Sequence, residues 1–143
     1  MESLKLNTGV KRVLINDGPD VLEFNPSDIS FVERFYQMIT EYKARMKEFE
    51  QRANEIEKKD TVDEDGVPLN ISERIKFVRE LCQFCYSRID QAFGEGTSQK
   101  VFQGVENLEV VEQFFSGLLP MIQDSRKESL AKYSSKQDSS VLK

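Results

Sequence analysis

The stretch VERFYQMITEYKARMKEFEQRANEI, residues 32–56, decides the fold of this chain. Counted from Val32, apolar side chains recur at alternating steps of three and four residues as far as Ile56. The series is Val32, Phe35, Ile39, Tyr42, Met46, Phe49, Ala53 and Ile56. Such a repeat, held for about three and a half heptads, is typical of one long amphipathic helix. We predict a helix over residues 28–59, which at about 1.5 Å per residue would be roughly 48 Å long.

The apolar stripe on this helix narrows along its length. In the first half the flanking positions are also apolar, whereas in the second half they carry charge. The apolar flanks are Ile29, Phe31, Tyr36 and Met38, and the charged flanks are Lys43, Arg45, Glu50, Arg52, Glu57 and Lys59. A wide stripe packs into a globular core, and a narrow stripe with charged flanks suits a single partner helix. The sequence therefore predicts a helix that is rooted in a domain at its start and contacts one neighbour towards its end.

Two neighbours can cover the narrow half of the seam. One is the next helix of the same chain, and the other is a second copy in a parallel coiled coil. In such a coil Arg45 would face Glu50 of the other copy, and Arg52 would face Glu57. Exposed ion pairs contribute only about a few tenths of a kcal/mol each, so they favour a homo-oligomer weakly. The residues that we expect at this partner or oligomer interface are Tyr42, Arg45, Met46, Phe49, Glu50, Ala53 and Ile56.

Composition and charge limit the classes of function. The chain has 143 residues, of which 31% are charged and 38% hydrophobic, which suits one domain with a modest core. The net charge is −5, and Lys and Arg are interspersed with Glu and Asp without a basic run. We therefore expect no nucleic-acid partner. The chain has no His, which removes the commonest general base and the commonest transition-metal ligand.

No targeting or membrane-spanning segment stands out. The first ten residues, MESLKLNTGV, contain no long apolar run, so we expect no signal peptide. No stretch approaches about 18 consecutive apolar residues, so we expect no membrane span. These features predict a cytoplasmic protein whose two cysteines are reduced.

The start of the chain is typical of short strands. Leu4 and Leu6 alternate with polar neighbours, and residues 13–15 form a short apolar run. A dense turn signal over residues 16–20 separates this run from a returning strand at residues 21–24. We predict a small antiparallel sheet of two strands joined at the Asp-Gly pair of that turn, with a third strand available from the segment around Leu4.

Two helix starts carry capping signals. Ser27 is expected to cap the long helix, with Asp28 in its first turn. Asn70 is expected to cap a second helix over residues 71–93, and Glu73 follows at the spacing of a capping box. The second helix is apolar on two sides, which predicts neighbours on both.

The last part of the chain predicts one more long helix, over residues 107–132. Pro120 lies inside its apolar pattern, so we expect a kink or break after Leu119. A short helical segment is expected near residues 99–103. The expected fold class is mainly α with a small N-terminal antiparallel β element, an α+β chain. Its parts are residues 1–25 (sheet), 26–132 (helical domain) and 133–143 (a polar, disordered tail).

Two strings resemble chemical motifs without their usual context. Cys82-Gln-Phe-Cys85 matches C-x-x-C but falls in mid-helix on the apolar seam, which favours buried apolar residues over a redox site. A zinc site would need four ligands, so two chains would have to share the ion. The string GEGTS at residues 94–98 lacks the Lys-Ser/Thr pair of a phosphate-binding loop and is better explained by helix caps.

The loop between the first two helices resembles a calcium-binding loop only in part. Asp63, Asp65 and Gly66 fit positions 3, 5 and 6 of an EF-hand. Positions 1 and 12 would be Thr61 and Ser72, where calcium requires an Asp and a bidentate Glu. We therefore expect no metal site, no cofactor and no enzymatic activity.

Several strings of the chain resemble a family of small tail proteins from phages and prophages of Gram-positive bacteria, the tail assembly chaperones. The strings are Leu-Asn-Thr-Gly-Val-Lys-Arg-Val (residues 6–13), the Ile15-Asn-Asp turn, Glu-Phe-Asn-Pro-Ser-Asp (residues 23–28) and, most specific, Phe-Gly-Glu-Gly-Thr-Ser-Gln-Lys-Val-Phe-Gln (residues 93–103). The similarity extends over residues 4 to about 122. None of the strings is a catalytic signature.

The resemblance implies a non-enzymatic role in the cytoplasm of a bacterial host cell. Proteins of this kind coat the long tape-measure protein while the tail tube polymerises around it, and are then displaced. The second half of the long helix offers an apolar surface that could exchange a self-contact for such a client. Two alternatives stay open at this point: a structural tail protein that is retained in the particle, and a generic helical dimerisation module.

Overall fold

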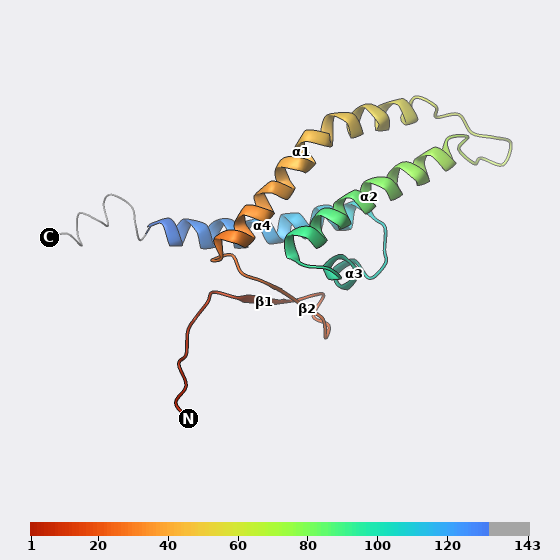
Figure 1. Ribbon diagram of the computed structural model, residues 1–143. Helices are drawn as coiled ribbons and strands as arrows, with labels where there is room; N and C mark the ends of the chain where they lie inside the picture. The colour runs from red at the N-terminus through yellow and green to blue at the C-terminus, as the bar shows by residue number, and fades with distance from the viewer. Residues whose placement is uncertain (132–143) are drawn as a thin grey trace.

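The computed structural model describes residues 1–131 of the chain (Figure 1). Its elements are β1 (Lys11–Leu14), β2 (Val21–Phe24), α1 (Ile29–Glu57), α2 (Ile71–Phe93), α3 (Thr97–Phe102) and α4 (Leu108–Ala131). The predicted fold class, mainly α with a small N-terminal antiparallel sheet, is confirmed. The disordered tail predicted at residues 133–143 lies outside the described residues.

The sheet has two strands among the described residues. Lys11 pairs with Phe24, and Leu14 pairs with Val21, in antiparallel register. Asn16 and Asp17 form the turn with φ of 53° and 56°, so the turn lies one residue earlier than the predicted Asp-Gly pair. Asn and Asp adopt this left-handed conformation more readily than other non-glycine residues. The third strand expected around Leu4 is not formed.

Helix α1 is one unbroken helix, as the heptad pattern predicts. Its 29 residues give a length of about 43 Å at about 1.5 Å per residue. The N-cap is Asp28 and not the expected Ser27, because the Asp28 carboxylate accepts a hydrogen bond from the backbone N–H of Ser30 at 3.0 Å. The backbone N–H of Ser27 instead donates to the side chain of Asn25 at 2.9 Å.

Helix α2 runs back along α1, and the two form a long antiparallel hairpin that projects from the rest of the molecule (Figure 1). Two ion pairs join the helices, and a third joins α2 to a residue just after the end of α1. They are Glu41–Arg88 at 2.6 Å, Arg52–Glu80, and Lys59–Glu73 at 3.3 Å. Of the two neighbours considered for the narrow half of the seam, the structure places α2 of the same chain there.

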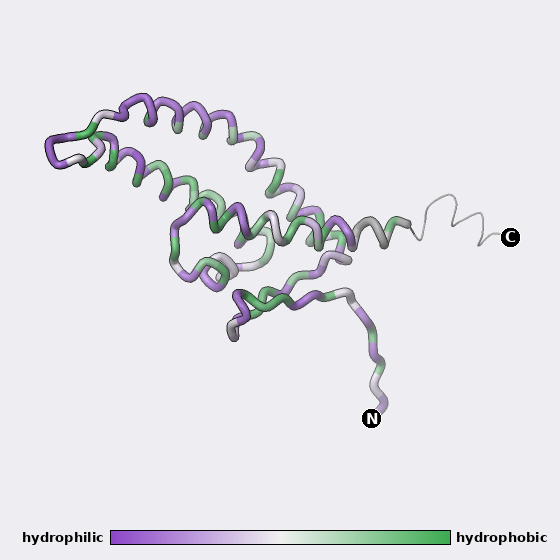
Figure 2. Tube along the Cα trace, turned by 180° about the vertical axis from the view of Figure 1, so that it is seen from behind, coloured by the Kyte–Doolittle hydropathy of each residue, from purple (hydrophilic) through white to green (hydrophobic). Residues whose placement is uncertain are grey.

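The hydrophobic core lies at the base of this hairpin. Six phenylalanine rings meet there with centroids 5.1–6.2 Å apart, from β2, α1, α2, α3 and α4: Phe24, Phe31, Phe35, Phe93, Phe102 and Phe114. Phe35, Ile89 and Ile122 are fully buried. Phe31 and Met38 of the wide half are therefore in the core, whereas its other two apolar flanks, Ile29 and Tyr36, are exposed. The far half of α1 is mostly hydrophilic with single hydrophobic residues (Figure 2).

The α1–α2 connection uses its capping residues differently from the prediction. Asn70 occupies the N-cap position of α2, but its side chain makes no capping bond. The Asn70 amide is buried and donates to the carbonyl of Ile56 at 2.8 Å, which ties the end of α1 to the start of α2. Glu73 pairs with Lys59 and so does not complete a capping box.

Helix α4 continues through Pro120 without a break, and the expected kink stays a prediction. Proline removes one backbone hydrogen bond, to the carbonyl four residues earlier, at Ser116. That residue is exposed, so water can satisfy its carbonyl. Burial of Leu118 and Ile122, on either side of the proline, holds the two halves against the core.

Candidate partner-binding site

An apolar groove forms where α1, α2 and the first turns of α4 meet. We call it the seam groove, and its volume is about 220 Å³. Five of the seven residues predicted for a partner interface line it: Tyr42, Met46, Phe49, Glu50 and Ala53. From α2 come Phe77, Leu81 and Cys85, and from α4 come Leu108, Val111 and Glu112. The sequence pattern identified the α1 wall but did not indicate that α4 closes the other side.

The floor and the rim of the seam groove differ in exposure. Phe49, Phe77 and Leu81 are buried and form the floor, whereas Met46 at the rim is 37% exposed. The two charged residues that line the groove, Glu50 and Glu112, are both exposed and acidic. The groove therefore combines an apolar floor with a negative edge.

Tyr42 brings a neutral phenol group into this groove. It is half-buried, and burial raises the pKa of its phenol above the usual value, with further contributions from Cys85, Glu112 and Glu50. The neutral ring can pack against an apolar partner while its O–H stays available as a hydrogen-bond donor.

The other two predicted residues lie outside the seam groove. The Arg45 guanidinium stacks over the rings of Phe49 and Phe84, 4.9 and 4.7 Å from their centroids. Ile56 is half-buried at the far end of α1, where its carbonyl accepts the bond from Asn70. Arg45 covers an edge of the α1–α2 pair that does not line the groove.

The arginines expected to join two copies contact their own chain. Arg52 pairs with Glu80 of α2, and its guanidinium lies 5.2 Å from the ring centroid of Phe77. Arg45 lies 3.8 Å from Glu48 in the same helix. A parallel coiled coil through Arg45–Glu50 and Arg52–Glu57 would have to compete with these contacts. The predicted homo-oligomer through α1 stays a prediction.

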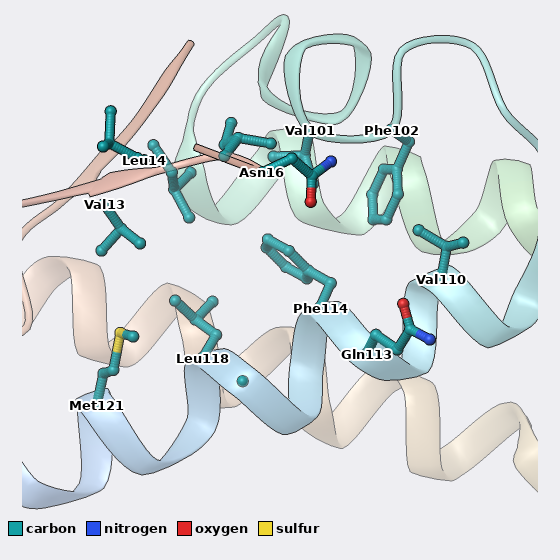
Figure 3. A pocket seen from close by; sticks show the side chains of 13 residues that line it. Val13, Leu14, Asn16, Val101, Phe102, Val110, Gln113, Phe114, Leu118 and Met121 are labelled. Atoms are coloured by element: carbon teal, nitrogen blue, oxygen red, sulfur yellow. The ribbon is translucent and has the colours of Figure 1, made fainter. Parts of the chain in front are cut away.

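A second apolar groove lies between the β-hairpin, α3 and α4, and the sequence did not indicate it (Figure 3). We call it the hairpin groove, after the β1–β2 hairpin and not the α1–α2 hairpin, and its volume is about 270 Å³. Its apolar walls include Val13, Leu14, Val101, Val110, Phe114 and Met121. These residues come from three separate parts of the chain, so no local pattern of the sequence brings them together.

The two cysteines, the residues most able to act as nucleophiles or metal ligands, are buried in the fold. Cys82 and Cys85 are buried free thiols, and burial, with a smaller contribution from Cys82, raises the pKa of Cys85 to about 11. A thiol with so high a pKa is a poor nucleophile and a poor metal ligand at neutral pH. Within residues 1–131 no group of three or more His, Cys, Asp or Glu residues could hold a metal ion.

The GEGTS segment, residues 94–98, binds a carboxylate of the same chain. Asp90 of α2 accepts hydrogen bonds from the backbone N–H and the hydroxyl of Ser98, at 2.7 and 2.9 Å. A carboxylate therefore occupies the place that a bound phosphate would take near the start of α3.

In the loop between α1 and α2, the Asp63 carboxylate accepts hydrogen bonds from the backbone N–H groups of Asp65 and Val67, both at 2.9 Å.

Comparison with protein families gives a match over most of the chain. The model of a protein family described as "Family of unknown function (DUF6673)" matches residues 19–140. No curated protein and no solved structure matches the chain. The matched range begins just before β2 and includes every residue that lines the seam groove, but it leaves out β1. No helix within the described residues is long and apolar enough to cross a membrane.

Proposed function

The chain belongs to this family of unknown function (DUF6673), and we propose that it is a phage or prophage tail assembly chaperone. In this proposal it holds the tape-measure protein in the cytoplasm of the bacterial host while the tail is built. The observation that carries the proposal is the seam groove, an apolar surface between the α1–α2 hairpin and α4 whose α1 side chains recur at helical spacing. The resemblance of residues 6–13, 15–17, 23–28 and 93–103 to tail assembly chaperones supports it independently.

The size and shape of the seam groove favour a helix as its occupant. Pockets for drug-sized ligands usually have volumes of about 300–1,000 Å³. The 220 Å³ of the seam groove is smaller, but it suits single apolar side chains presented by a partner. An amphipathic helix presents such side chains at intervals of three and four residues and binds along a groove between helices. A tape-measure protein, as a long helical protein, would offer many such segments.

The charge of the rim narrows the kind of helix. Glu50 and Glu112 stand at the edges of the groove, and the whole chain has a net charge of −5. Complementary charges across an interface increase the rate of association and select the partner. We therefore expect the bound segment to carry Lys or Arg beside its apolar positions.

The rim also shows which substitution tests the proposal. Met46→Asp places a charge in the groove at a position that is already 37% exposed, so the fold should tolerate it. Phe49→Asp is unsuitable, because Phe49 is buried against Phe77 and Phe84 and its change would disrupt the hairpin. Ile75→Asp is the matched control, since Ile75 is 51% exposed on α2 and does not line the groove.

The experiment is co-expression with the tape-measure protein proposed as the client. The wild-type chain and Ile75→Asp should keep that client soluble and co-purify with it. Met46→Asp should weaken the complex by roughly ten- to a hundredfold, as loss of a buried interface contact does. Circular dichroism should show the same helix content in all three proteins. Undiminished binding by Met46→Asp would remove the seam groove as the client site.

Two alternatives predict different results. A structural tail protein would remain in the finished particle, whereas a chaperone would be absent from purified tails when they are examined by mass spectrometry. A dimerisation module would self-associate through α1 without any client, and Met46→Asp would then change the oligomeric state of the purified chain.

A further inference from the structure

Residues 3–8 extend from the molecule and expose large apolar side chains. Residues 1–10 contain neither helix nor strand, and this segment leads away from the body of the fold (Figure 1). Leu4 is 84% exposed and Leu6 is 73% exposed. In an extended chain, residues two apart lie on the same face, so these two leucines form one apolar edge. We call residues 3–8 the arm.

The direction in which the arm leaves the fold is fixed by its contacts with the β2–α1 corner. The Asn25 side-chain amide donates to the carbonyl of Thr8 at 2.8 Å. Gly9 has φ of +87°, and a Cβ at this position would lie 2.5 Å from the Oγ of Ser27. Only glycine fits here, for both reasons. In the structure the arm does not pair with β1 of its own chain.

A receiving surface for such an arm exists on the same molecule. β1 pairs with β2 alone in the described part of the chain, which leaves its other edge open to an added strand. In β2, the carbonyl of Val21 accepts a hydrogen bond from the side-chain ammonium of Lys100 in α3, at 3.4 Å. The hairpin groove begins at the end of β1, where Val13 points toward Leu118 and Met121 of α4 (Figure 3).

We propose that the arm adds to β1 of a second copy of this chain and places Leu4 and Leu6 in that copy's hairpin groove. The main-chain hydrogen bonds of an added strand supply affinity, and pockets for alternate side chains supply specificity. Side chains on one face of a strand repeat at about 7 Å, so neighbouring leucines can occupy one continuous groove. A second copy is the occupant because every copy carries both the exposed leucines of the arm and the apolar hairpin groove, so one contact covers both.

This contact does not use the seam groove. An arm that binds the next copy produces a closed pair if the exchange is mutual, and an open chain of copies if it is not. In both arrangements the α1–α2 hairpin of every copy stays free. Arm exchange is therefore compatible with client binding but does not depend on it.

Sedimentation velocity of the purified chain over a range of concentrations tests the proposal. The wild type should associate, and Leu4→Ser/Leu6→Ser should raise the dissociation constant by roughly a hundredfold, because two apolar side chains lose their burial. Met121→Glu, on the opposite surface, should weaken association similarly. Met121 is 36% exposed, so this change should not unfold the chain. Ile75→Ser is the control and should associate like the wild type.

Mixing the variants gives the decisive result. The arm of Met121→Glu is intact and the groove of Leu4→Ser/Leu6→Ser is intact, so an equimolar mixture should form a one-to-one complex that neither variant forms alone. A wild type that stays monomeric throughout, an arm variant that associates like the wild type, or variants that fail to combine would each overturn the proposal.

Discussion

The two halves of α1 are parts of one helix but are held in place by different interactions. In the first half, Phe31, Val32, Phe35 and Met38 are all buried in the core. In the second half Phe49 is the only buried residue; it packs against Phe77 and Phe84 of α2, and the Arg52–Glu80 ion pair joins this half to α2. The tip of the hairpin even exposes apolar residues, with Leu69 at 66% and Ile75 at 51%. Helical periodicity therefore sets the length of α1, but four of its five buried residues lie in the first half.

Truncating one ring in each half should give the largest difference. Phe35 is fully buried and contacts Phe31 and Phe93 in the core. Phe35→Ala should lower the free energy of unfolding by about 3–5 kcal/mol, a large part of the stability of a domain of this size. Phe49→Ala should cost about half as much, because α1 and α2 can close over the gap or admit water. Urea denaturation followed by circular dichroism measures both.

Hydrogen exchange separates the effects by location. Phe35→Ala should increase amide exchange throughout the helices, whereas Phe49→Ala should increase it mainly in residues 45–56 and 71–80. Equal losses of stability with the same exchange pattern would show that the hairpin and the base unfold as one unit.

The sequence predicted α1 and α2 well because a heptad series is a local property. The bounds 28–59 and 71–93 agree with Ile29–Glu57 and Ile71–Phe93 to within two residues. The errors arise where a polar side chain has a choice of partners. Asn70 is a residue type that often caps helices, but its side-chain amide instead donates a hydrogen bond to the carbonyl of Ile56, which is distant in sequence.

Only the α1 wall of the seam groove could be predicted from the sequence. Tyr42, Met46, Phe49 and Ala53 follow from the spacing along one helix. The opposite wall, Leu108 and Val111, comes from a helix whose position depends on packing at the base. The hairpin groove has no continuous wall in the sequence, since Val13 and Met121 meet only after β1 and α4 have packed.

The thiol of Cys85 tests whether the far half opens in the native protein. Cys85 lines the seam groove, and burial raises its pKa from 9.0 to about 11. An unfolded chain loses this proton near pH 9 and the folded chain only near pH 11, so the folded state binds more protons between these values. Stability should therefore fall as the pH rises through this range, and Cys85→Ala should reduce the slope.

Reaction with a thiol reagent gives the same information near neutral pH. Since the reactive species is the thiolate, a pKa raised by this amount should make Cys85 react roughly a hundredfold more slowly in the folded chain than in urea. Rapid modification under native conditions would mean that the groove opens frequently, and the difference between the two halves would then be larger than their packing suggests.

The smallest expected effect concerns the ion pair between Arg52 and Glu80. Their side chains are 34% and 50% exposed, so Arg52→Gln should cost only about 0.5 kcal/mol. The hydrogen bond from Arg52 is the main cause that lowers the pKa of Glu80. The stabilisation should therefore be present above the pKa of an unfolded Glu and be lost as the pH falls through the lowered value.

A double-mutant cycle with Glu80→Gln isolates this pair from the stacking of Arg52 on Phe77. The coupling energy should decrease at high salt, because exposed charges are screened, while the cost that comes from stacking should remain. A coupling energy that does not change with salt would mean that the far half of α1 is held by packing, like the base. In that case the two halves would differ in their degree of burial but not in the kind of interaction that stabilises them.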